Sequence, residues 1–162
     1  MNHNTVEQFW IKYQSQNAEF RNIKTPVSYY FCDNEKDANE CTELVLKGVK
    51  QATTHTLVGL NLSNESLPQV DDLAIVTNWD GTPKAIIRTI KVEIVNLGDI
   101  TAEYAFIEGE GDKSLSYWNE VHWDYYIREL AAYNLKPTPE MEVVCEYFET
   151  IYPPKTQPSK SR

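Results

Sequence analysis

The sequence predicts an α+β domain in which helices flank a strongly curved sheet or a small β-barrel. Apolar side chains recur at helical spacing at the start of the chain and over residues 114–134, whereas residues 51–95 are rich in β-branched residues and residues 141–152 alternate with strand period. The chain has 162 residues, 41% of them hydrophobic, which suits one domain with a real core. We therefore expect a single domain over residues 1–152 and a disordered tail at 153–162, where three prolines occur without an apolar anchor.

Two helices and one strand are expected in the first third of the chain. Residues 5–17 carry apolar side chains at the spacing of one helix face, and VSYYF at 27–31 is dense in residues that favour strands. A second helix is predicted to begin near Asn34 and to end at Gly48, which supplies the left-handed residue typical of a helix C-terminus. Its inward face is expected to carry Ala38, Cys41, Leu44 and Val45.

The middle of the chain is predicted to be mostly extended. QATTHTLVGL at 51–60 is rich in Thr and Val, and a polar loop is expected at 61–72. A strand at 73–78 leads into a hairpin turn at 79–82. The segment 84–95 contains enough Ile and Val for one long strand or two bent ones.

The last third is predicted to contain a short helix at 101–106, a third long helix from Ser114 to near Asn134 and a final strand at 141–152. Between the two helices, the glycines of EGEGD at 108–112 prevent regular helix. The buried stripe of the long helix is expected to carry Leu115, Trp118, Val121, His122 and Tyr125, with Arg128 and Glu129 facing water.

The charge balance narrows the function classes. The chain has 24 acidic and 15 basic residues, a formal charge of −9 that repels polyanions, so a broad nucleic-acid coat protein is excluded and DNA is not expected as a partner. A local cleft for a nucleotide or a single flexible strand stays possible. The chain has neither an apolar run of about 20 residues nor a signal sequence, so we expect a cytoplasmic protein without a membrane partner. The three cysteines are interpreted as reduced packing residues.

Neither a metal site nor a cofactor is expected from the sequence. His3, His55 and His122 are isolated, and no metal-ligand spacing of Cys and His occurs. His122 is interpreted as a hydrogen-bonded, half-buried residue of its helix. Both glycine-rich nucleotide-binding motifs are missing, which excludes P-loop and Rossmann sites.

Two segments are candidates for a site. GVKQATT at 48–54 places a lysine and hydroxyls between a helix end and a strand, where functional groups are commonly exposed. The alternative, which spacing alone favours, is a solvated lysine that complements the helix dipole beside threonines of ordinary strand propensity. EGEGD has two interpretations. Either one of its carboxylates turns inward and pairs with a lysine, or the acidic loop only caps the next helix through Asp112 or Ser114.

Four segments in the same order resemble the ASCH domain family of the PUA-like superfamily. They are GVKQAT, LPQVDDLAIVTNWDGTPKAIIRT, EGEGD with SLSYWNEVHWDYY, and MEVVCEYFETIY, so that the resemblance covers roughly residues 27–152. It implies a PUA-like fold, a small β-barrel with flanking helices, and a cleft for RNA or nucleoside ligands. The chain departs from the family at Asp71, where Gly is frequent, and at His55, where a small polar residue is common. The departure at His55 touches the cleft and bears on substrate choice.

The resemblance also implies site residues. Some relatives are amidohydrolases that act on N4-acylated cytidine with a Lys, a Thr three positions later and a Glu, whereas others bind or cleave RNA. Carried over, the motif assigns catalytic roles to Lys50, Thr53 and Glu108, with Glu110 as the competing acid. Substrate-binding roles then fall to Gly48, Thr54, His55, Arg88 and Glu110.

The leading hypothesis is hydrolysis of an amide on a modified nucleoside. Lys50 would act as base or nucleophile once burial lowers its pKa, Thr53 would supply a hydroxyl, and Glu108 would move a proton. The alternatives are a noncatalytic RNA-binding domain, in which Lys50 and Arg88 contact the phosphates of single-stranded RNA, and a ribonuclease. The basic residues are scattered and do not form a basic stripe alongside the cleft, which favours a small ligand over RNA. Candidates for stacking on the base are Tyr29, Tyr30 and Trp79.

Overall fold

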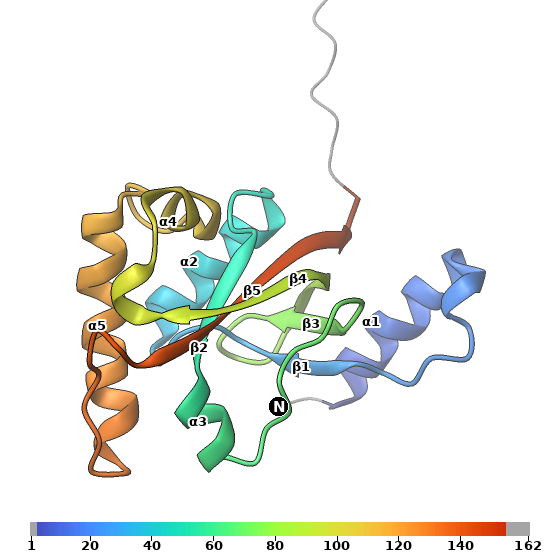
Figure 1. The fold of residues 1–162 in the computed structure, drawn as a ribbon. Helices are drawn as coiled ribbons and strands as arrows, with labels where there is room; N and C mark the ends of the chain where they lie inside the picture. The colour runs from blue at the N-terminus through green and yellow to red at the C-terminus, as the bar shows by residue number, and fades with distance from the viewer. Residues whose placement is uncertain (1–2, 155–162) are drawn as a thin grey trace, which may run out of the picture.

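A computed structural model describes residues 3–154 and shows a curled five-stranded sheet with helices around it (Figure 1). The strands are β1 (Val27–Tyr29), β2 (Ala52–Thr56), β3 (Leu73–Thr77), β4 (Pro83–Asn96) and β5 (Glu142–Tyr152). They lie in the order β1-β3-β4-β5-β2, and every neighbouring pair is antiparallel except β1 with β3. The α+β class predicted from the sequence is confirmed.

The two longest strands give the sheet its curvature. β4 has 14 residues and β5 has 11, and they pair along most of their lengths. Their register shifts between Ile86 and Ile87 and again between Thr89 and Lys91. Such bulges bend a strand and increase its twist. The sheet therefore curls into a half-barrel, with β1 and β2 at its two edges, and 84–95 belongs to one long strand.

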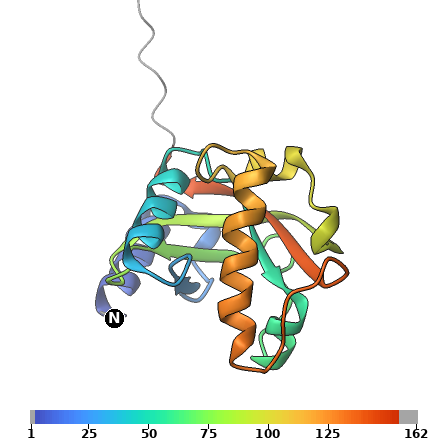
Figure 2. The same ribbon diagram turned by 90° about the vertical axis from the view of Figure 1, so that its left-hand side faces the viewer.

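Within residues 3–154, five α-helices surround the sheet. They are α1 (His3–Gln16), α2 (Glu35–Leu46), α3 (Leu57–Leu62), α4 (Ala102–Glu108) and α5 (Leu115–Ala131), with 3-10 turns η1 (Ala18–Phe20) and η2 (Leu97–Asp99). Asn34, Thr101 and Ser114 cap α2, α4 and α5, because each side chain accepts a hydrogen bond from the backbone N–H three residues later. Figure 1 shows α1 and α5 at opposite ends of the sheet, and Figure 2 shows α5 crossing in front of the strands.

The core consists of three clusters of buried side chains along the sheet. Trp10 of α1 belongs to the cluster that contains Ile75 of β3. Val45 of α2 belongs to a second cluster with Phe148 of β5. The third cluster joins α4 and α5 to β2 and β5, and Trp118 is part of it. Packing thus fixes α2, α4 and α5 around one end of the sheet.

The segment expected to be extended at 51–60 divides into a strand and a helix. Residues 57–62 form α3, so the predictions of extended backbone after Thr56 and of a loop from residue 61 are wrong. The Thr56 hydroxyl accepts a hydrogen bond from the N–H of Gly59 at 3.1 Å and so starts the helix. A short apolar run has no periodicity that separates helix from strand.

The remaining helices and strands lie within a few residues of their predicted positions. The predicted tail at 153–162 falls mostly on residues 155–162, which lie outside the described residues. A membrane-spanning helix, long and apolar enough for a bilayer, is not found within residues 3–154.

Candidate active site

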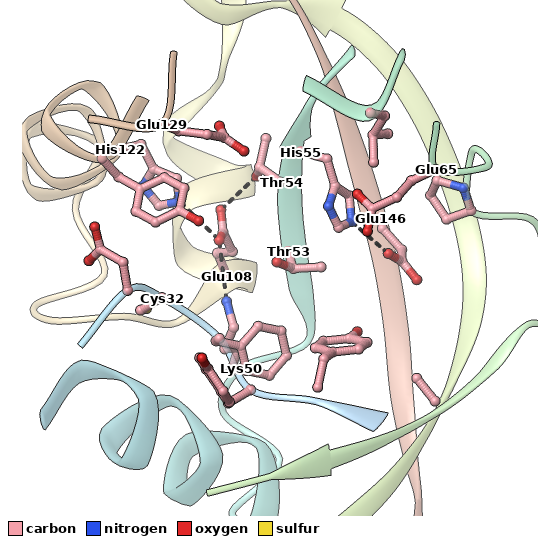
Figure 3. Close-up of a pocket in the computed structure, with 18 of the residues that line it drawn as sticks. Cys32, Lys50, Thr53, Thr54, His55, Glu65, Glu108, His122, Glu129 and Glu146 are labelled. Atoms are coloured by element: carbon pink, nitrogen blue, oxygen red, sulfur yellow. Dashed lines mark hydrogen bonds and ion pairs between the residues drawn. The ribbon is translucent and has the colours of Figure 1, made fainter. Parts of the chain in front are cut away.

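A cavity of about 800 Å³ lies between α5 and the curled sheet. All five strands contribute side chains to its wall, as do α5 and the turn after α4. Small-molecule sites usually have volumes of about 300–1,000 Å³, so the cavity has room for a nucleoside-sized ligand. Figure 3 shows Lys50, Thr53 and Glu108 close together, with His55 and Glu146 on the opposite side of Thr53.

The position of Lys50 follows from the way in which α2 ends. Gly48 has a φ of 71°, and the N–H groups of Val49 and Lys50 donate to the Leu44 carbonyl at 2.9 and 3.1 Å, which turns the chain back beneath the helix. The Lys50 side chain is only 1% exposed. Its ammonium donates a hydrogen bond to the Ala52 carbonyl at 2.9 Å, so that it points across the start of β2.

Two carboxylates neutralise the Lys50 ammonium. Nζ lies 3.3 Å from Oε1 of Glu108 and 3.3 Å from Oε1 of Glu110. Burial lowers the pKa of Lys50, but the charges of Glu110 and Glu108 outweigh burial and raise the pKa above its ordinary value. The prediction that burial would lower the pKa of Lys50 is therefore wrong in this structure. Lys50 is a cation here, not a free amine.

Glu108 meets Lys50 because Gly109 allows two segments to approach closely. Gly109 ends α4 with a φ of 75°, in the left-handed region that glycine tolerates best. A Cβ at this position would lie 2.4 Å from the backbone oxygen of Val49, which precedes Lys50. The N–H of Gln51 also donates to the Ile107 carbonyl at 3.0 Å. The first glycine of EGEGD thus brings the acidic residue to the lysine.

The carboxylate of Glu108 accepts hydrogen bonds from four side chains. Lys50 and the Nε2 of His122 approach Oε1 at 3.3 and 3.1 Å, while Thr54 donates to Oε2 at 2.9 Å and the indole N–H of Trp118 donates to the same oxygen. Burial raises the pKa of Glu108, but His122, Lys50 and these hydrogen bonds outweigh burial and hold the pKa well below its usual range. Glu108 is therefore an ionised anchor with every strong acceptor site occupied.

A second buried acid lies on the other side of Thr53. Glu146 of β5 pairs with Thr53 across the sheet, and its Oε1 lies 2.9 Å from the Nε2 of His55. The Thr89 hydroxyl donates to Oε2 of Glu146 at 2.6 Å. Burial raises the pKa of Glu146, but the hydrogen bonds from His55 and Thr89 lower it by more. Thr53 thus stands between the Lys50–Glu108 pair and the hydrogen-bonded His55–Glu146 pair on the cavity wall.

Two of the predicted binding residues do not reach the cavity. Gly48 shapes the backbone before Lys50 but is not part of the wall. Arg88 is also outside the wall, and its guanidinium pairs with Glu149 on the neighbouring strand. The next residue, Thr89, takes the inward position because adjacent strand residues point to opposite faces. Arg88 therefore does not line this cavity, and its assignment to a substrate site stays a prediction.

The other predicted residues line the cavity. Its wall contains Lys50, Thr53, Thr54, His55, Glu108 and Glu110. Of the candidate stacking residues, Tyr29 and Tyr30 are also in the wall, whereas Trp79 packs on Tyr30 at a ring distance of 4.6 Å without lining the cavity.

Sequence reasoning missed several members of the site. His122 is hydrogen-bonded, as expected, but one of its partners is Glu108 rather than helix backbone alone. Glu129, expected to face water, is half-buried in the wall, and burial raises its pKa. Glu146 had a usable signal, because strand alternation places it in phase with the buried Val144 and Phe148.

The cavity wall is strongly acidic. Its lysine and arginine are Lys50, which two carboxylates contact, and Arg128, which pairs with Asp33 at 2.8 Å. Its two histidines, His55 and His122, contact Glu146 and Glu108. The acidic side chains in the wall are Asp33, Asp37, Glu65, Asp72, Glu108, Glu110, Glu129 and Glu146. Such a lining repels a phosphate group.

A model of the ASCH domain family matches residues 27–152 of the sequence. The chain belongs to the ASCH domain family. Among solved structures, an ASCH domain from Lactobacillus crispatus is 34% identical, with a TM-score of 0.87 over 93% of this chain and 96% of that one. A protein from Enterococcus faecalis is 33% identical, with a TM-score of 0.83 over 91% of this chain and 88% of that one. A search of curated proteins found no match.

The ASCH domain also gathers potential metal ligands that are far apart in the sequence. Within residues 3–154, one such group is Glu108, Glu110 and His122, and a second is Cys32, Cys41 and Glu110. The first group already surrounds the Lys50 ammonium, which neutralises its carboxylates. In the second group Glu110 is also paired with Lys50, and its other two members are the thiols of Cys32 and Cys41.

Proposed function

We propose that this ASCH domain hydrolyses the amide of an N4-acylated cytidine at the nucleoside level. The observation that carries the proposal is the buried Lys50–Glu108 pair in the cavity wall with Thr53 beside it. These are the three residues that the family resemblance assigns to this reaction. Their side chains come from three separate segments, the end of α2, the strand β2 and the end of α4, and converge at one place.

The proposed reaction adds water across the amide bond. The oxygen of water attacks the acyl carbon, the bond from that carbon to N4 breaks, and N4 takes the proton that water loses, so that cytidine and a carboxylic acid leave. Lys50 enters as a cation, and the N–H that it directs at Glu110 turns to the acyl oxygen as negative charge develops there. The Thr53 hydroxyl both accepts and donates a proton, which suits it to pass the proton of water to N4. Glu108 holds the ammonium in position.

The wall chemistry supports a nucleoside in preference to RNA. Its excess of carboxylates opposes phosphate, whereas carboxylates accept hydrogen bonds from ribose hydroxyls. Tyr29 and Tyr30 offer aromatic surface of the kind on which bases stack. The RNA-binding alternative assigned phosphate contacts to Lys50 and Arg88, and Arg88 instead pairs with Glu149.

The test is turnover of a panel of acylated nucleosides that includes N4-acetylcytidine, with products separated by chromatography. Thr53→Val keeps the shape of the side chain and removes its hydroxyl, so hydrolysis should fall by about 100-fold or more while the fold is kept. Lys50→Met should lose activity as well, but it also leaves buried carboxylates without their cation and lowers stability. The Thr53 variant is therefore the sharper test.

Thr82→Val is the matched control, because Thr82 is an exposed residue of the turn between β3 and β4, away from the cavity wall. Its turnover should equal that of the wild type. Full turnover by Thr53→Val would overturn the assigned role of the hydroxyl. Absence of turnover on every acylated nucleoside by folded wild-type protein would overturn the reaction itself.

A further inference from the structure

We propose that Cys32, Cys41 and Glu110 form a binding site for Zn²⁺ in the cavity wall, beside Lys50. The three side chains come from the connection between β1 and α2, the middle of α2 and the turn after α4. One ligand atom from each lies within 4.8 Å of the other two. The site does not depend on the proposed deacylation, and Zn²⁺ has no part in the reaction described above.

The separation of the two sulfur atoms suits a shared metal ion. The Sγ atoms of Cys32 and Cys41 are 3.7 Å apart. Two zinc–sulfur bonds of about 2.3 Å at a tetrahedral angle place their sulfur atoms about 3.8 Å apart. A disulfide requires about 2.05 Å, so the sulfurs would have to approach by roughly 1.6 Å. Zn²⁺ therefore fits with little movement of either side chain.

Glu110 supplies the third ligand. Its Oε1 lies 3.0 Å from the Sγ of Cys41, which donates a hydrogen bond to it. Zinc–sulfur and zinc–oxygen bonds of about 2.3 and 2.1 Å at a tetrahedral angle would place the two atoms about 3.6 Å apart, so the carboxylate would move by roughly 0.6 Å. Two thiolates and one carboxylate favour Zn²⁺ over Mg²⁺ or Ca²⁺, which prefer oxygen ligands throughout.

The charges of the site also balance. Zn²⁺ replaces one proton on each thiol, so its two positive charges are offset by two thiolates and the net charge of the buried cluster does not change. Glu110 keeps its negative charge and can still neutralise the Lys50 ammonium 3.3 Å away. Metal binding therefore leaves the charge balance around Lys50 intact.

The fourth position of a tetrahedral ion would face the cavity. Cys41 is buried, but Cys32 and Glu110 both line the cavity wall. Cys32 has a φ of 68°, in the left-handed region that non-glycine residues rarely adopt and that often marks a functional site. Three protein ligands and one open position are typical of zinc that exchanges a water or a small ligand.

The experiment uses the full chain, reduced, stripped of metal with a chelator and freed of chelator by dialysis. After incubation with Zn²⁺ and removal of unbound metal, elemental analysis should find one zinc per chain. Titration with Co²⁺ should produce the near-ultraviolet charge-transfer band of cobalt thiolates and the intense visible bands of a tetrahedral ion. Both measurements are made on wild type and need no variant.

Cys32→Ser and Cys41→Ser should each reduce or abolish the Co²⁺ thiolate signal. Each should also weaken Zn²⁺ affinity by more than about 100-fold, because loss of a residue that only hydrogen-bonds to a metal ligand costs up to about that much. Cys145→Ser is the matched control, since Cys145 is equally buried but belongs to a different cluster. It should bind metal as the wild type does. Wild-type protein that retains no zinc, or a Co²⁺ spectrum without a thiolate band, would overturn the site whatever the outcome of the deacylation assay.

Discussion

Glu108 shows how a buried charge can be kept ionised. Its carboxylate receives donors from Lys50, Thr54, Trp118 and His122, which belong to the end of α2, to β2 and to α5. A buried carboxylate with fewer partners would carry a large desolvation cost. Because four donors share one acceptor, a substitution at any of them is felt by the Lys50 ammonium as well.

His122→Asn should lower stability in a pH-dependent manner. Burial lowers the pKa of His122, but the charge and hydrogen bond of Glu108 raise it above 6.5, with Glu110 adding to the effect and Lys50 opposing it. The stabilisation that protonated His122 contributes is therefore complete below about pH 6.5, and it is lost as the pH rises through the higher pKa that His122 has in the folded protein. Denaturant unfolding should show a loss of about 1.5–3 kcal/mol at pH 6, the range for a charged hydrogen bond, and a smaller loss at pH 9.

Trp118→Phe provides the comparison for this titration. It removes another donor to Glu108, but an indole N–H does not titrate between pH 6 and 9. The loss of unfolding free energy in Trp118→Phe should stay nearly constant between pH 6 and 9. A difference between wild type and His122→Asn that grows with pH would contradict the assigned charge state.

The site residues that the sequence could predict were those in short local motifs. Lys50 and Thr53 lie three positions apart, and Glu108 lies next to a glycine, so the family resemblance identifies them. Trp118 and His122 look like ordinary core residues of a helix, because their contact with Glu108 depends on how α5 packs. That Arg88 lies outside the cavity wall could not be predicted, since the face of β4 that meets the cavity depends on two bulges.

The approach of α4 to the start of β2 depends on Gly109. Gly109→Ala adds left-handed strain of about 1–2 kcal/mol and pushes a methyl group against the Val49 backbone oxygen. Thermal or denaturant unfolding should show a loss of at least that size. Any turnover should fall more than stability alone explains, because the displaced segment carries Lys50.

Gly81→Ala is the control that separates left-handed backbone strain from the close approach to Val49. Gly81 has a φ of 89° in the turn between β3 and β4, remote from the cavity wall. It should lower stability without changing turnover of the folded protein. If Gly109→Ala behaves in the same way, the close approach to Val49 has no part in positioning Lys50.

Helices and strands were predictable where their periodicity extends over many residues. α1, α2 and α5 each have at least 12 residues, and capping residues mark the start of α2 and α5. α3 has six residues, too few for a helical repeat, and its cap Thr56 also ends a Thr-rich strand. The pairing of β2 with β5 could not be predicted, because residues 57–141, more than half of the domain, separate the two strands.

If the proposed deacylation is correct, the charge of the whole ASCH domain should influence which acylated nucleosides react. The chain carries a formal charge of −9, and the cavity wall concentrates acidic side chains. A 5′-phosphate on N4-acetylcytidine should therefore lower kcat/KM by about tenfold or more at low salt, equivalent to about 1.4 kcal/mol. Steady-state kinetics with the nucleoside and its monophosphate provide the comparison.

Salt dependence tests the cause of this discrimination. Added salt screens exposed charges beyond about 10 Å at 0.1 M ionic strength, so the difference between the two substrates should narrow as salt rises. The nucleoside itself serves as the control, because an uncharged substrate should respond little. Preference for the monophosphate, weakening with salt, would indicate a phosphate site and contradict the expectation.

The order of strands in the sheet also determines when the cavity wall is completed during protein synthesis. β2 carries Thr53, Thr54 and His55, and among the described strands it bonds only to β5. The ribosome makes residues 52–56 long before residues 142–152. At about 5–20 residues per second, β2 waits for its partner for roughly 4–17 s, while β1, β3 and β4 already have theirs. The nascent chain can therefore pair β1, β3 and β4 first, and it completes the cavity wall last.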